Sequence, residues 1–219
     1  MLTFEALKKN EAVNVYIQKA DESLSALGYT EHSFAHVGKV AQDAADILRA
    51  LDFSERDREL VQIAAYLHDI GNLVNRIEHS QSGAIMAFRI LDRLDMAPEE
   101  LAVVVSAIGN HDEGTGVPVN AIAAALILAD KSDVRRTRVR NQDPATFDIH
   151  DRVNYSAMSS HLQIDEARKT IVLSIAIDTG ISSVMEYFEI FLERMILCRK
   201  AAQTLGLTFG LVINGQQML

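Results

Sequence analysis

The sequence predicts a mainly α-helical protein that ends in a small α+β unit. Up to about residue 140, apolar residues recur three and four positions apart, which is the spacing of one buried helix face. In two stretches near the carboxyl terminus they alternate with other residues, which is typical of a strand. We therefore predict a helical domain over residues 1–147 and an α+β unit over residues 148–219. The second unit could equally be an extension that completes a single core.

The first two predicted helices have clear signals. The apolar face of one consists of Val37, Val40, Ala41, Ala44, Leu48 and Leu51. The next follows Ser54, which with Asp57 three residues later has the spacing of a capping box. Its apolar face consists of Leu60, Ile63, Ala64 and Leu67, and Gly71 is expected to end it.

Three more helices are expected before residue 140. One follows Ser82 and carries Ile85, Phe88 and Leu91. Another begins at Pro98, which is favourable in a first turn, and runs to about Ile108. The third spans about residues 120–134, after a GTGVP loop.

The carboxyl-terminal unit is predicted from alternating patterns. Strands are expected at 171–177 and 207–213, and a weaker pattern predicts a third over Val153–Ile164. Between the first two lies an amphipathic helix marked by Val184, Phe188, Phe191 and Met195. Such strands need covered faces and protected edges. Pairing across a two-fold axis would supply both, so we expect a homodimer.

Composition excludes several classes of protein. The formal net charge of −9 disfavours non-specific nucleic-acid binding. A single cysteine, Cys198, rules out an internal disulfide and a cysteine-rich zinc site. Apolar stretches such as Ala121–Ala129 are shorter than the ~20 residues that span a bilayer, and the amino terminus lacks the apolar stretch of a signal peptide. We expect a cytoplasmic protein that does not bind membranes.

Two carboxylates stand where helices are expected to face the core. Asp69 follows His68 in the last predicted turn of a helix, at the negative end of the helix dipole. Asp130 has apolar helical neighbours on three sides. Carboxylates in such places need a cation. Arginine could serve, and so could a metal, which the adjacent imidazole favours.

His36, at the start of the first of these helices, adds a second imidazole to the set. Two imidazoles and two carboxylates suit Mn, Fe, Co, Ni or Zn, and suit Mg less well. Each residue alone has an ordinary structural explanation, and a second His-Asp pair at His111–Asp112 shows how common the dipeptide is. The order His, His-Asp, Asp on separate helices is much more specific.

With this order, the sequence resembles the HD-domain metal-dependent phosphohydrolases. The matching segments read HVGKVA (36–41), AAYLHDIG (64–71) and LILADKSD (126–133), and the resemblance covers residues 30–135. It implies an HD-domain helical bundle. It also implies that a divalent metal is bound by His36, His68, Asp69 and Asp130.

Two further histidines, His79 and His111, lie where family members with two metals carry additional histidines. By resemblance, Asp69 would bridge two metals while His79 and His111 help to hold the second. Alternatively, both histidines contact substrate phosphate or line the pocket.

The phosphodiesterases of the HD-GYP type, which act on cyclic dinucleotides, share this layout. This sequence has Asn72 where they carry a lysine, Asn110 in place of a second histidine, and no GYP tripeptide. These differences disfavour cyclic di-GMP as the substrate.

The expected activity is hydrolysis of a small phosphomonoester or phosphodiester, with a nucleotide as the favoured class. One or two bound metals would activate water and neutralise charge on the phosphoryl group. Asp69 would orient the water, and Lys131 could touch the phosphate, although a lysine at this position could equally face solvent. The sequence has neither a Gly-rich phosphate loop nor a serine-nucleophile motif.

Two other hypotheses remain open. One is a metal- or ligand-binding regulatory protein on a catalytically silent scaffold, and the other is a helical oligomerisation module whose histidines only pack. Residues 131–140, with Arg135, Arg136, Arg138 and Arg140, carry a net charge of +4. This segment could attract a polyanionic substrate. Alternatively, it could be a solvated face or form ion pairs between subunits.

Overall fold

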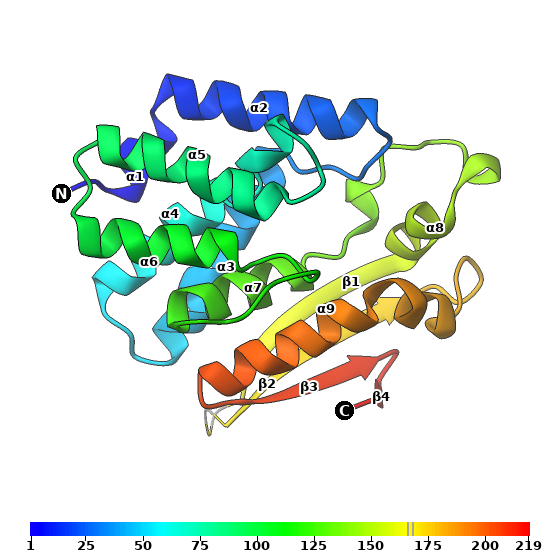
Figure 1. Cartoon of the computed structure of the whole chain (residues 1–219). Helices are drawn as coiled ribbons and strands as arrows, with labels where there is room; N and C mark the ends of the chain where they lie inside the picture. Colours follow the sequence, from blue (N-terminus) through cyan, green and yellow to red (C-terminus); the bar gives the residue numbers. More distant parts are fainter. Residues whose placement is uncertain (166, 168) are drawn as a thin grey trace.

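The structure is a computed structural model that describes residues 1–165, 167 and 169–219. Helices make up most of the molecule, and a four-stranded sheet lies at one end of the bundle (Figure 1). This confirms the predicted mainly α architecture with a small α+β extension. The elements are α1 (Phe4–Lys8), α2 (Glu11–Ala26), α3 (Phe34–Ala50), α4 (Glu55–Leu67), η1 (Ile70–Leu73), α5 (His79–Arg93), α6 (Pro98–Gly109), α7 (Ala121–Ser132), η2 (Arg136–Arg138), η3 (Pro144–Thr146), α8 (Ile149–Ser156), β1 (Ala157–Ile164), β2 (Thr170–Ile177), α9 (Val184–Thr204), β3 (Thr208–Ile213) and β4 (Gln216–Gln217).

The centre of the bundle is formed by α3, α4 and α7, which pack against one another. Ser54 and Asp57 form the predicted capping box at the start of α4. Residues 123–129 of α7 are all fully buried, which explains why this helix is apolar on every side. Asp130 therefore lies in the last turn of a helix that is buried on nearly every side.

Helix α4 ends at Leu67, four residues before the glycine that was expected to stop it. A Cβ on Gly71 would collide with the carbonyl oxygen of His79 and lie 2.5 Å from the amide nitrogen of Gly83. Glycine is needed there because η1 and the first turn of α5 approach each other through their backbones. This contact joins the segment after His68–Asp69 to the helix that begins at His79.

The fifth helix differs from its prediction in both start and buried face. It begins at His79 rather than after Ser82. Of the three residues expected on its buried face, Leu91 is fully buried, whereas Ile85 and Phe88 are 72% and 48% exposed. The rest of the buried face includes Gly83, Ala84 and Ala87, and these small residues allow α5 to pack closely on α6 and η1.

The carboxyl-terminal sheet has the order β1-β2-β3-β4. The predicted strands at 171–177 and 207–213 are confirmed as β2 and β3, but the one expected over Val153–Ile164 begins only at Ala157. Its first four residues belong to α8, whose amino terminus is capped by the side chain of Asp148. β2 and β3 are parallel and are connected through α9, as parallel strands require a crossover.

Helix α9 joins the two parts of the molecule, because it packs on both α7 and β3. Buried apolar residues from Leu7 to Ile213 form one continuous cluster. The predicted division of the chain into a helical domain (1–147) and an α+β unit (148–219) therefore remains a prediction. No helix in the described part of the chain is long and apolar enough to cross a membrane.

Candidate metal centre

Four of the predicted site residues converge at the carboxyl ends of α4 and α7 and the first turn of α3. His68 Nε2 lies 3.1 Å from Asp69 Oδ2 and 3.6 Å from Asp130 Oδ1. His36 Nε2 lies 3.5 Å and 3.3 Å from the same two oxygen atoms. Two imidazole nitrogens and two carboxylate oxygens thus surround one small space.

The two imidazoles have the orientation that metal binding requires. His36 Nδ1 lies 2.8 Å from Asp133 Oδ2, and His68 Nδ1 lies 2.7 Å from the carbonyl oxygen of Ala65. These acceptors place a proton on each Nδ1, so that Nε2 presents a lone pair to the site. Both Nε2 atoms are fully buried and have no hydrogen-bond partner among the described residues. Buried polar atoms are rarely left unpaired, and a divalent cation would satisfy both.

The electrostatics of the site favour a cation as well. Burial alone would lower the pKa of His68, but the carboxylates of Asp69 and Asp130 raise it to about 10. Burial opposes a charge on Asp69 and Asp130. The neighbouring His68 nevertheless holds the pKa of Asp69 well below the ordinary value, and Lys131 does the same for the pKa of Asp130. The two carboxylates are thus charged at neutral pH, and the space between them is suited to positive charge.

His79 and His111 lie beside this cluster, on the side of the second Asp69 oxygen. His79 Nε2 is 3.2 Å from His111 Nε2, and the two atoms are 3.5 Å and 4.0 Å from Asp69 Oδ1. His111 Nδ1 is 2.7 Å from the carbonyl oxygen of Ile108. Among the residues that the structure describes, two groups of three have geometry that could hold an ion. These are His36, His68 and Asp130, and His68, Asp69 and His111.

Lys131 is buried and points into the site. Its side chain is 6% exposed, and Nζ lies 2.8 Å from Asp130 Oδ2 and 2.6 Å from Glu113 Oε2. The other oxygen of Glu113 accepts a hydrogen bond of 2.8 Å from Arg194 Nε. Asp130, Lys131, Glu113 and Arg194 therefore form a row of alternating charges that ends on α9. Asp130 Oδ2 is held by Lys131, while Asp130 Oδ1 faces the two imidazoles.

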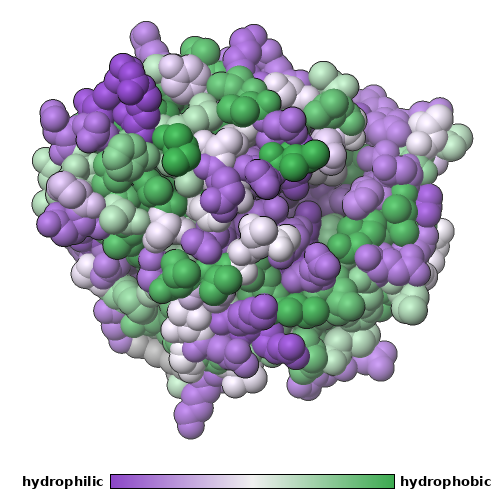
Figure 2. Space-filling view, viewed as in Figure 1, coloured by the Kyte–Doolittle hydropathy of each residue, from purple (hydrophilic) through white to green (hydrophobic). Residues whose placement is uncertain are grey.

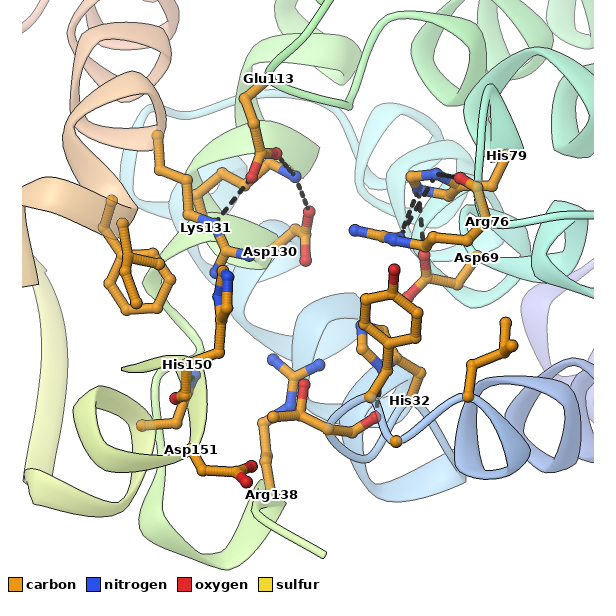
Figure 3. Close-up of a pocket in the computed structure, with 18 of the residues that line it drawn as sticks. His32, Asp69, Arg76, His79, Glu113, Asp130, Lys131, Arg138, His150 and Asp151 are labelled. Carbon is orange, nitrogen blue, oxygen red and sulfur yellow. Dashed lines mark hydrogen bonds and ion pairs between the residues drawn. The ribbon is translucent and has the colours of Figure 1, made fainter. Parts of the chain in front are cut away.

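These residues open into a pocket of about 440 Å³. In Figure 2 it is seen as a hollow with hydrophilic residues between the helical bundle and α8. In Figure 3, Asp130, Lys131 and Glu113 form one wall, while Asp69, His79 and Arg76 form the opposite wall. Polar residues of α8, including His150 and Asp151, line the outer part.

Several residues of the site were missed by the sequence analysis. Asp133 is fully buried and holds His36, and its only sequence signal was its place in the LILADKSD segment. Arg76, Glu113 and Arg194 reach the pocket through loops or from α9, so no local pattern reveals them.

The arginine-rich segment is occupied by contacts within the chain. Arg138 is buried, and its Nη1 donates to the carbonyl oxygen of Asp133 at 2.8 Å. Arg135 Nε pairs with Asp133 Oδ1 at 2.6 Å, and Arg140 pairs with Asp21. Arg136 Nη2 also lies 3.8 Å from Asp178 Oδ2, so all four arginines of this segment form ion pairs within the chain.

Comparison with known proteins identifies the family of this chain. An uncharacterized protein of Methanocaldococcus jannaschii, MJ1020, is 26% identical over 212 residues, covering 84% of this chain and 80% of that protein. A crystal structure of a predicted HD superfamily hydrolase from an uncultured Thermotogales bacterium is 20% identical and covers 62% of this chain and 75% of that one, with a TM-score of 0.47. The family model of the HD domain matches residues 33–145, which is more than half of the chain and includes His36, His68, Asp69 and Asp130. This chain therefore belongs to the HD domain family.

Proposed function

We propose that this protein is a metal-dependent phosphohydrolase that cleaves a phosphate ester of a small, nucleotide-like molecule with activated water. The observation that carries the proposal is the pair of buried, unpartnered Nε2 atoms of His36 and His68, which face the oxygens of Asp69 and Asp130. Membership of the HD domain family supports it independently.

The donor set also bears on the identity of the metal. A cluster of two imidazoles and two carboxylates suits Mn, Fe, Co, Ni or Zn, whereas Mg prefers oxygen ligands and retains several waters. When bound, such an ion would lower the pKa of water and neutralise charge on a phosphoryl oxygen.

The residues of the site then have distinct roles in the proposed reaction. Asp69 and Asp130 hold negative charge between the imidazoles, and Asp69 Oδ1, on the side of His79 and His111, is placed to orient water and accept its proton. His111 carries its proton on Nδ1, so its Nε2 is an acceptor. Lys131 lines the pocket and can donate to a phosphate oxygen.

Metal content is the first test. Protein purified without chelator or nickel resin is expected to contain at least one transition-metal ion per chain. His68→Gln and Asp69→Asn should lose hydrolysis of nitrophenyl phosphates and nucleotides, while His161→Gln, on exposed strand β1, should retain it. No metal after incubation with Mn²⁺ would refute the proposal. Bound metal without turnover on a broad phosphoester panel would instead favour a regulatory protein on the same scaffold.

Location and assembly are part of the same proposal. A cytoplasmic enzyme that binds neither membranes nor nucleic acid non-specifically would suit a small, soluble phosphorylated substrate, and the acidic composition supports this. The homodimer remains a prediction from the strand edges of the sheet.

A further inference from the structure

Four cationic side chains line the pocket, and three of them are already paired with carboxylates. Lys131 contacts Asp130 and Glu113, Arg194 contacts Glu113, and Arg138 lies 3.7 Å from Asp133. Arg76 is different, because it makes no ion pair with a carboxylate in the described part of the chain. A half-buried guanidinium in a pocket, with its charge not neutralised by an acid, is suited to an anionic ligand.

The position of Arg76 is determined by neutral groups. Its Nη1 lies 3.2 Å from His79 Nε2, 3.4 Å from His79 Nδ1 and 3.5 Å from Asn72 Oδ1. The guanidinium carbon also lies 5.7 Å from the ring centroid of Tyr29. Figure 3 shows the Arg76 side chain beside His79 and Asp69 and directed into the pocket, toward the wall that carries Lys131.

This position coincides with the side of the site where a second metal would be expected. By the family resemblance, such an ion would be held by His79, His111 and Asp69. A guanidinium is always charged and here rests against His79. Asp69 Oδ1 already accepts a hydrogen bond of 3.1 Å from the amide of Asn72. A second divalent cation would meet a fixed positive charge and a carboxylate oxygen that is partly engaged.

We propose that the Arg76 guanidinium serves as the second cationic group of the site in place of a second metal ion, and binds the phosphate of the substrate. This rests on the proposed phosphohydrolase function. His36, His68, Asp69 and Asp130 would hold one metal, and Arg76 would bind the phosphate from the opposite side. His79 and Asn72 are then positioning residues that hold the guanidinium in place.

The inference also selects a substrate class. A guanidinium binds two oxygens of one phosphate side by side. A phosphomonoester has three non-bridging oxygens, so it can offer one to the metal and two to Arg76. A phosphodiester has only two, so it can offer just one to the guanidinium once the metal is engaged. The site should therefore favour phosphomonoesters.

The first measurement is the metal stoichiometry of the wild-type protein, saturated with Mn²⁺ and then freed of excess ion. One ion per chain is the expected result. Two ions would overturn the role of Arg76 as a replacement cation but leave the phosphohydrolase intact. No ion would refute the phosphohydrolase itself, and the inference with it.

The second measurement is binding of orthophosphate to the Mn²⁺-loaded protein by calorimetry. Arg76→Met should weaken it at least ~10-fold, as loss of a charge-assisted contact predicts, without changing the metal stoichiometry. Arg76→Lys keeps the positive charge but loses the planar guanidinium that can donate two hydrogen bonds side by side. Its affinity for orthophosphate should therefore lie between those of the wild type and Arg76→Met. Arg89→Met, on the exposed side of α5, is the matched control and should bind like the wild type.

Steady-state kinetics separates binding of the phosphate from general damage. Arg76→Met should raise KM for 4-nitrophenyl phosphate more than KM for bis(4-nitrophenyl) phosphate. Circular dichroism would verify that the variant is folded, and Arg76→Lys provides a milder substitution if it is not. Equal phosphate affinity in the wild type and in folded Arg76→Met, or an equal effect on both esters, would overturn the inference.

Discussion

Asp133 shows how one residue outside the metal cluster can control it. Its carboxylate lies 2.8 Å from His36 Nδ1 and pairs with Arg135 Nε at 2.6 Å. It therefore sets the tautomer and orientation of His36, as carboxylate partners of metal-bound histidines do. Removing its charge should leave the imidazole in place but make Nε2 a poorer ligand.

We accordingly predict that Asp133→Asn weakens Mn²⁺ affinity by ~10- to 100-fold, the usual effect of losing such a partner. Calorimetric titration of the metal-free protein would measure it. Asp43→Asn, which removes a half-buried acid from the exposed side of α3, is the control and should leave the affinity unchanged. An unaltered affinity in Asp133→Asn would mean that His36 is oriented by packing alone.

At the level of single residues, the sequence was informative where chemistry and periodicity coincide. His36, His68, Asp69 and Asp130 could be selected because acids and imidazoles stood on apolar helix faces, and the structure places them together. Arg76 could not be selected in this way, because an arginine in a polar loop is common and does not stand out from its neighbours. Its importance depends on which cations find carboxylate partners, and this is decided by the tertiary fold.

At the level of elements, the junction between η1 and α5 requires glycine at position 71, and this requirement can be tested. A Cβ on Gly71 would meet the backbone of α5, whereas one on Gly38, within α3, would meet no atom within 4 Å. Gly71→Ala should destabilise the protein by ~1–3 kcal/mol through overpacking. Gly38→Ala should instead stabilise it by about 0.5–1 kcal/mol, because alanine has the higher helix propensity.

Urea denaturation of both variants would measure these effects. Because the backbone at Gly71 also positions the segment after Asp69, Gly71→Ala should lose metal affinity as well. Equal stability of the two variants would show that α5 can move away without cost.

The start of α9 should make stability depend on pH. Glu186 accepts a hydrogen bond of 2.8 Å from the Ser183 backbone amide and pairs with Arg152 of α8 at 3.0 Å. These contacts lower its pKa from 4.5 to about 2. Because the pKa is lower in the folded state, the stabilisation is complete above pH 4.5 and is lost as the pH falls toward 2.

The predicted difference in unfolding free energy between wild type and Glu186→Gln is therefore constant above about pH 5 and shrinks below pH 4.5. Denaturation curves at a series of pH values would measure it. Glu189→Gln, on the exposed side of the same helix, should show no such change. A difference that stays the same at pH 3 would exclude the carboxylate as its source.

Element types were predictable where a single periodicity ran the whole length, as in α3, β2 and β3. The sequence analysis found the helix α5 but misplaced part of its buried face, and it predicted a strand for the last four residues of α8. Close packing of α5 selects Ala84 and Ala87 for the buried face beside Leu91, so Ile85 and Phe88 are misleading. In residues 153–156, the helix that begins at the Asp148 cap outweighs a weak alternating pattern.

At the level of the whole molecule, the helical and α+β parts are connected by several hydrogen bonds and an ion pair. Ser160 of β1 donates to the carbonyl oxygen of Ser132 at 2.6 Å, and Arg136 Nε donates to that of Tyr155 at 2.6 Å. Arg194 of α9 reaches Glu113 beside the candidate metal centre. The sequence left open whether residues 148–219 form a separate unit, because patterns within a segment do not show what its buried face contacts.

These contacts, together with the single buried cluster, lead us to predict that the whole chain unfolds in one cooperative transition. Far-ultraviolet circular dichroism and tyrosine fluorescence should give coincident urea curves, since tyrosines lie in both parts of the chain and tryptophan is absent from the sequence. A chain ending at residue 147 would lack α9, which covers α7 and supplies Arg194, so it should neither fold cooperatively nor bind Mn²⁺. Two separated transitions, or a stable metal-binding fragment of residues 1–147, would instead mean that the α+β part is an independent domain.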